Sequence, residues 1–137
     1  KLYQILYFRI MKFHHIGYLV NNFNSAVKDF EKFNYKKKKS IITDNNLKVQ
    51  IQFLVNGNNI IELVKPHKKN LGLVKLLRKK NYAYHFAYKV ENLDKTLIKL
   101  KKDFKIIVNP VPAKAFNNKK VTFLKMKNDF IIELIQS

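Results

Sequence analysis

The stretch HIGYLVNNFN at residues 15–24 returns later in the chain as HFAYKVENLD at residues 85–94. Both stretches follow the pattern H-x-x-Y-x-V-x-N, and each continues with an apolar residue and then Asn or Asp. A second match is closer, because residues 60–63 and residues 131–134 both read IIEL. The first two stretches are 70 residues apart and the second two are 71 residues apart. Two separate matches at nearly one spacing indicate an internal repeat.

The first repeat predicts a strand, a helix and then three more strands. Asn24 is expected to cap a helix that runs to about Phe33. Its apolar face would hold Ala26, Val27, Phe30 and Phe33. The segment Asn56-Gly57-Asn58 supplies residues that tolerate positive φ, which predicts a tight hairpin between the last two strands. The expected strands are residues 13–20, 35–42, 47–55 and 59–65.

The second repeat predicts the same order of elements. Asp94 is expected to cap its helix, with Leu97, Ile98 and Leu100 on the apolar face. The third element is expected to be interrupted by Pro110 and Pro112, and the last two strands to form a hairpin across Lys127-Asn128. The expected strands are residues 83–90, 104–109, 119–126 and 129–136.

The 137 residues are therefore expected to form one α+β domain over residues 13–136, made of two βαβββ modules. The modules are placed at residues 13–65 and 83–136. A basic connector at residues 66–82 joins them, and its segment LGLVKLLRKK predicts a short amphipathic helix. Residues 1–12 begin with KLYQILYFRI, which has a short apolar stretch and no small-residue cleavage site after it. We interpret these ten residues as an upstream extension or expression remnant and expect the natural start at Met11.

The composition excludes several classes of protein. The chain has no cysteine, which excludes disulfides and thiolate metal sites and makes the cytoplasm the expected compartment. No apolar run approaches the roughly 20 residues that a membrane-spanning helix needs, so no membrane partner is expected. The 28 Lys and Arg against 9 Asp and Glu give a formal net charge of +19. Because only Arg9 and Arg78 are arginine, specific nucleic-acid binding ranks last and a small anionic molecule is preferred.

The repeat supplies one imidazole and one carboxylate in each half. His15 and His85 open the first strands, whereas Glu62 and Glu133 lie inside apolar closing strands. An isolated carboxylate is costly to bury, so the face that carries each Glu must be solvated or must hold a cation. Two imidazoles with two carboxylates suit Zn²⁺, Ni²⁺, Co²⁺, Mn²⁺ or Fe²⁺. We therefore predict one divalent metal ion held by His15, Glu62, His85 and Glu133.

The other two histidines are left out of the predicted site. Strand alternation points His14 to the face opposite His15. His67 follows Pro66 in the basic connector, where a surface position is expected.

The repeated pattern resembles the vicinal oxygen chelate superfamily, which includes glyoxalase I, methylmalonyl-CoA epimerase, extradiol dioxygenases and fosfomycin resistance proteins. The resemblance covers roughly residues 13–136. Its specific parts are the H-[IF]-x-Y-x-V opening and the IIEL closing, each present twice. It implies paired βαβββ modules that form a cupped mixed sheet around a divalent metal, with His15, Glu62, His85 and Glu133 in the ligand positions.

The resemblance also implies a reaction. The expected activity is that of a metal-dependent isomerase or lyase, of the glyoxalase I (lactoylglutathione lyase) or methylmalonyl-CoA epimerase type, which stabilises an enolate-like intermediate. Glu133 and Glu62 are the catalytic candidates, with Glu133 favoured as the base by its position. Relatives are often dimers, which favours a homodimer.

Two departures from the relatives favour an alternative, a non-catalytic protein of the same fold that binds a small molecule. The segment F-Y-x-x-x-L-G, common after the first helix of related isomerases, is replaced by FEKFNY at residues 30–35. The epimerases carry an additional acidic base before the first hairpin, and in this region only Asp44 is a candidate.

Overall fold

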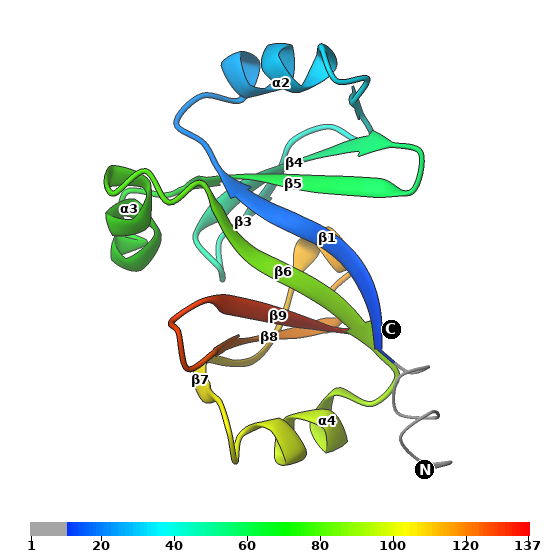
Figure 1. The fold of residues 1–137 in the computed structure, drawn as a ribbon, viewed down its shortest axis with the longest axis vertical. Coiled ribbons are helices and arrows are strands. Elements are labelled where there is room, and N and C mark those ends of the chain that lie inside the picture. Colours follow the sequence, from blue (N-terminus) through cyan, green and yellow to red (C-terminus); the bar gives the residue numbers. More distant parts are fainter. Residues whose placement is uncertain (1–10) are drawn as a thin grey trace. The chain divides into compact units, whose positions relative to one another are not determined.

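The computed structural model describes residues 11–137, and its elements form an α+β fold with nine strands, paired in both parallel and antiparallel fashion, and three α-helices (Figure 1). The chain divides into two compact units, His15–Tyr84 and residues 11–14 with His85–Ser137. Residues 1–10 of the expected extension (residues 1–12) lie outside the described residues. Met11 already belongs to the first strand. In the part of the chain that the structure describes, every helix is too short or too polar to span a bilayer.

The unit His15–Tyr84 contains the first repeat and the connector. Its strands lie in the order β2-β4-β5-β1, with β3 beside β4. Strands β4 and β5 form an antiparallel hairpin, whereas β1 runs parallel to β5. The amphipathic helix expected in the connector is present as α3. The elements are β1 (Met11–Leu19), α2 (Phe23–Glu31), β2 (Lys36–Lys37), β3 (Ile42–Asp44), β4 (Val49–Asn56), β5 (Asn59–Pro66) and α3 (Leu71–Arg78).

The strand expected at residues 35–42 was wrong in extent. The structure has the two-residue strand β2 and, separately, β3, and both pair with β4. The chain leaves the sheet between them, where the Lys39 carbonyl accepts a hydrogen bond from the buried side-chain amide of Gln52. The two-residue hairpin between β4 and β5 is confirmed, with Gly57 at a φ of 58°.

Helix α2 begins one residue after Asn22, so the prediction that Asn24 is its cap was wrong. The backbone at Asn22 is extended, with a φ of −141°, and the Asn22 Oδ1 accepts a hydrogen bond from the Ser25 N–H at 3.2 Å. The helix ends at Glu31 rather than near Phe33, and the Phe33 side chain is 69% exposed. Phe33 therefore does not belong to the apolar face.

The core of this unit lies between α2 and one face of the sheet. The buried side chains of Val20, Val27, Leu54, Ile61 and Leu63 form it, and Tyr18, Phe23, Ala26, Phe30 and Tyr35 pack against it. Because side chains alternate along a strand, the residues next to Tyr18 and Leu63 point to the opposite face. His15 lies three residues before Tyr18, and Glu62 lies next to Leu63, so both point to the face away from α2.

The second unit repeats this arrangement with its own strands. They lie in the order β6-β9-β8-β7, with β6 parallel to β9 and antiparallel pairing between β9, β8 and β7. The elements are β6 (Ala83–Val90), α4 (Leu93–Leu100), β7 (Lys105–Pro112), the 3₁₀ helix η1 (Lys114–Phe116), β8 (Lys120–Lys125) and β9 (Ile131–Gln136). The hairpin turn expected at Lys127-Asn128 includes Asp129, at a φ of 70°, and β9 begins at Ile131 rather than at residue 129.

Strand β7 continues to Pro112, so the interruption expected at its prolines was wrong. The strand pairs only with β8 in the sheet order and shows register shifts between Ile106 and Val111. Proline is tolerated at such an edge because its missing N–H removes no inner ladder bond. The bulged register absorbs the local irregularity.

The cap of helix α4 also lies two residues earlier than expected. Asn92 rather than Asp94 is the cap, and its Oδ1 accepts a hydrogen bond from the Lys95 N–H at 3.0 Å. Leu97 and Leu100 face the core as expected, but Ile98 is 56% exposed. Leu93 takes the remaining buried position. The core of this unit contains Val90, Leu93, Leu97, Leu124 and Leu134.

Replacing Asn22 with alanine should destabilise the protein by about 1 kcal/mol, because the first turn of α2 loses the acceptor for its Ser25 N–H. The midpoint of urea unfolding measures this effect. Asn24→Ala is the matched control, and it should change the free energy of unfolding by less than about 0.5 kcal/mol because Asn24 is exposed inside the helix. Equal losses from the two variants would contradict the assignment of the cap.

Candidate metal centre

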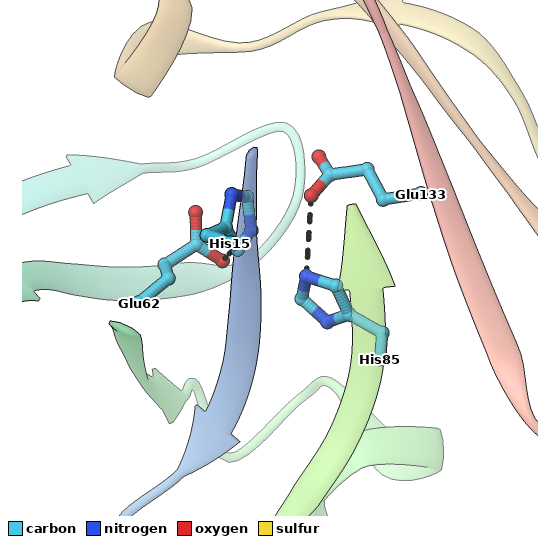
Figure 2. Close-up of side chains that lie close together, drawn as sticks. All are labelled: His15, Glu62, His85 and Glu133. Carbon is cyan, nitrogen blue, oxygen red and sulfur yellow. Dashed lines mark ion pairs between the residues drawn. The ribbon is translucent and has the colours of Figure 1, made fainter. Parts of the chain in front are cut away.

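The first buried pair consists of His15 in β1 and Glu62 in β5. The Nε2 atom of His15 lies 3.5 Å from the Oε1 atom of Glu62, and both residues are buried (Figure 2). In the parallel register between these strands, Gly17 lies beside Glu62. The residue beside the carboxylate in the neighbouring strand therefore has no side chain. Both members of the pair therefore come from adjacent strands and share one face.

The second pair has the same construction in the other unit. His85 in β6 and Glu133 in β9 place Nε2 and Oε1 3.2 Å apart, again with both residues buried (Figure 2). Ala87 lies beside Glu133 in the parallel register, so a small residue again accompanies the carboxylate. Tyr88 and Leu134 pack toward α4, which places His85 and Glu133 on the opposite face. The two halves of the repeat inferred from the sequence therefore carry the same buried His–Glu pair at equivalent positions.

Each pair has a phenylalanine neighbour that the sequence analysis missed. Phe53 in β4 lies directly opposite Glu62, and its ring centroid is 6.1 Å from that of His15. The signal in the sequence was a third match of the repeat, because residues 52–54 read QFL and residues 122–124 read TFL, again 70 residues apart. A phenylalanine inside an apolar strand is ordinarily a core residue, so this match suggested nothing beyond packing.

Phe123 is the equivalent residue in the second unit. It lies opposite Glu133 in the register between β8 and β9, and its ring centroid is 5.6 Å from that of His85. Both histidine–phenylalanine contacts are nearly perpendicular, at 78° for the first and 88° for the second.

The donor set is suited to a cation. His15 with Glu62 in one unit, and His85 with Glu133 in the other, are buried pairs of residue types that could hold a metal ion. A buried carboxylate without compensation is strongly unfavourable, and each one here has an imidazole as its neighbour. Imidazole nitrogen and carboxylate oxygen are the donors that borderline divalent ions accept. The residue types therefore fit a metal, and they do not distinguish one divalent ion from another.

The remaining candidates lie outside this group. The ring of His14 contacts the ring of Phe116, with centroids 5.4 Å apart. His67 is exposed as expected, and its Nδ1 accepts a hydrogen bond from the Lys69 N–H.

Asp44 serves the turn that follows β3. Its Oδ1 accepts hydrogen bonds from the backbone N–H groups of Asn46 and Leu47, both at 3.0 Å. The side chain is buried in this position. This is the local role that aspartate plays in many turns, and it explains the residue without a catalytic function.

Comparisons with known proteins identify a matching family and similar folds. Residues 14–123 match the model of the family described as Glyoxalase/Bleomycin resistance protein/Dioxygenase superfamily. A search of curated proteins found no match. Among solved structures, a hypothetical protein from Bacillus halodurans C-125 has a TM-score of 0.79 at 22% identity, over 93% of this chain and 94% of that chain.

Methylmalonyl-CoA epimerases are also similar in fold. The enzyme from Mycobacterium tuberculosis has a TM-score of 0.77 at 17% identity, over 91% of this chain and 87% of that chain. A Streptomyces coelicolor epimerase in complex with 2-nitronate-propionyl-CoA has a TM-score of 0.78 at 18% identity, over 92% of this chain and 96% of that chain. At these identities the similarity establishes the fold.

Proposed function

The chain belongs to the glyoxalase/bleomycin resistance protein/dioxygenase superfamily, and from that premise we propose that it is a metal-dependent isomerase or lyase. The reaction would be of the glyoxalase I or methylmalonyl-CoA epimerase type, with a proton moved at a carbon next to a carbonyl group. The observation that carries the proposal is the presence of two buried His–Glu pairs at equivalent positions of a repeat.

We propose that the two pairs share one divalent ion, with His15, Glu62, His85 and Glu133 as its ligands. The charges support a shared ion, because two carboxylates balance the two positive charges of the cation. Without such compensation, burial would leave two negative charges away from water. Zn²⁺, Ni²⁺, Co²⁺ and Mn²⁺ all accept this donor set.

A bound divalent cation would stabilise negative charge that develops on a substrate oxygen. The chain must then supply a group that removes and returns the proton. Glu133 is our first candidate for this general base and Glu62 the second, because both are carboxylates of the proposed centre. Such a base must come within hydrogen-bonding distance of the reacting carbon, roughly 2.6–3.2 Å between heavy atoms or through one water.

The proposed substrate is a small anionic molecule. The 28 basic and 9 acidic residues give the chain a field that attracts anions. One similar structure is a methylmalonyl-CoA epimerase in complex with methylmalonyl-CoA, which is a reason to test acyl thioesters on this chain. We further propose a cytoplasmic protein, because the chain has no cysteine, and a homodimer without a nucleic-acid or membrane partner.

A second candidate is a non-catalytic protein that binds a small molecule with the same centre. The observation that favours it is Asp44, the acidic candidate before the first hairpin, whose carboxylate is engaged by the turn. In that case the two pairs would hold the ion and the ion would hold the ligand, with no proton transfer.

Exchange with solvent deuterium separates the two functions. The metal-loaded protein would be incubated in D₂O with the hemithioacetal of methylglyoxal and, separately, with a 2-methyl-branched acyl-CoA. We expect deuterium at the carbon next to the carbonyl of one of them, detected by NMR, and none with protein treated with a chelator. A metal-loaded protein that is inert toward both and toward related carbon acids would support the binding function instead.

A further inference from the structure

We propose that Phe53 and Phe123 are positioning residues, whose rings hold the imidazoles of His15 and His85 in the orientation in which they bind the ion. The inference rests on the proposed function, because it concerns the same centre. It adds a pair of aromatic residues that supply no ligand atom and act through the histidines.

The argument begins with the first pair, where Phe53 has two neighbours at once. In the register between β4 and β5 it lies directly opposite Glu62, and its ring contacts the ring of His15 at 78°. Residues directly opposite each other in an antiparallel pair have Cβ atoms roughly 4.5–5.5 Å apart. Phe53, which is buried, therefore packs beside the carboxylate and against the imidazole of the same pair.

The second pair shows the same two contacts, here made by a residue of strand β8. Phe123 lies opposite Glu133 in the register between β8 and β9, and its ring contacts His85 at 88°. The residues that flank the two phenylalanines differ in part, since Gln52 precedes the first and Thr122 precedes the second. The aromatic ring is thus repeated at the position that faces the histidine.

Such a ring has a physical effect on metal binding. A perpendicular aromatic contact is favourable beyond simple burial, so it restricts the rotation of the imidazole before the ion arrives. Ordering the ligand in advance reduces the entropy lost on binding. An apolar group beside the donors also limits access of water to the ion, which strengthens its attraction to the carboxylates.

Ordinary core packing is the competing explanation, and it makes a different prediction. Phe30 and Phe104 are phenylalanines of the same two units, and both pack against the cores on the helix-bearing faces. If the rings near the histidines serve stability alone, replacing any of the four by leucine should affect metal binding equally. If they position the histidines, only Phe53→Leu and Phe123→Leu should weaken it.

The test measures zinc affinity by competition with a chromophoric chelator, on the full chain. We expect Phe53→Leu and Phe123→Leu each to weaken the affinity by roughly threefold to tenfold, and the double variant by more, whereas Phe30→Leu and Phe104→Leu stay within about twofold. If a leucine variant does not fold, the methionine variant of the same position replaces it. A double variant that binds zinc as tightly as the unaltered protein, or controls that lose as much, would overturn the inference.

NMR of the metal-free protein provides a readout that does not depend on bound zinc. Nuclear Overhauser effects should connect the ring protons of Phe53 with the imidazole of His15, and those of Phe123 with His85. The imidazole resonances should shift in the corresponding leucine variants and stay in place in Phe30→Leu and Phe104→Leu. Missing contacts would overturn the inference even if zinc binds. If the contacts are present but the unaltered protein binds no zinc, the proposed metal-dependent function is wrong. The rings of Phe53 and Phe123 would then contact the histidines without positioning a metal ligand.

Discussion

Replacing His85 with alanine should weaken the binding of a divalent ion by more than about 100-fold. Loss of a group that merely supports a metal ligand costs roughly 10- to 100-fold in affinity, and loss of the ligand itself should exceed that. The imidazole of His85 is buried and 3.2 Å from Glu133, so its removal also leaves the carboxylate without this neighbour. Competition titration with zinc measures the effect.

The controls decide whether the two pairs act together. His67→Ala should leave zinc affinity within about twofold, because His67 is exposed and its Nδ1 only accepts a hydrogen bond from Lys69. His15→Ala should cause the same large loss as His85→Ala. If His85→Ala left one zinc site of full affinity at the other pair, the pairs would bind separately and the shared ion would be wrong.

Replacing Glu133 with glutamine should lower the rate of proton transfer by about 10²- to 10⁴-fold, the contribution typical of a positioned general base. The side-chain amide keeps an oxygen that can coordinate a cation, so the loss of zinc affinity should be much smaller. The initial rate of deuterium exchange and the zinc affinity are measured on the same preparation.

Glu62→Gln is the matched comparison, since it alters the equivalent carboxylate of the other pair. We expect a smaller loss of rate for this variant if Glu133 is the base. Equal losses of activity and of metal affinity in Glu133→Gln would show that Glu133 is only a ligand. A larger loss of rate in Glu62→Gln would transfer the role of base to Glu62.

The internal repeat made the order of strands and helices predictable from the sequence. The exact start of each helix was not predictable, as the two errors at the helix caps show. The repeated pattern H-x-x-Y-x-V-x-N ends in Asn22 and Asn92, and these are the caps that the structure shows. Asn24 and Asp94 were equally good residue types two positions later. The choice depends on where the backbone leaves the extended conformation, which side-chain type alone does not determine.

Local context also explains the errors in the strands. Pro110 and Pro112 are compatible with β7 because that strand lies at the end of the sheet order, a property of topology rather than of local sequence. The run of lysines at residues 36–39 gave no indication that the chain leaves the sheet between β2 and β3. The phenylalanines beside the histidines were missed because their meaning depends on cross-strand register.

The four proposed ligands were identified from the sequence because buried charge is rare inside apolar strands. Two IIEL segments with their matching histidines were enough to select His15, Glu62, His85 and Glu133, which the structure shows as two buried pairs. The substrate has no comparable signal, because its recognition depends on side chains gathered from several elements.

The stoichiometry of metal binding tests the central claim most directly. Metal-free protein would be titrated with zinc while free and bound zinc are measured by competition with a chelator of known affinity. The shared centre predicts one tightly bound ion for each chain. Two ions of similar affinity for each chain, or fewer than about a tenth of an ion, would contradict the proposal that both buried pairs hold the same cation.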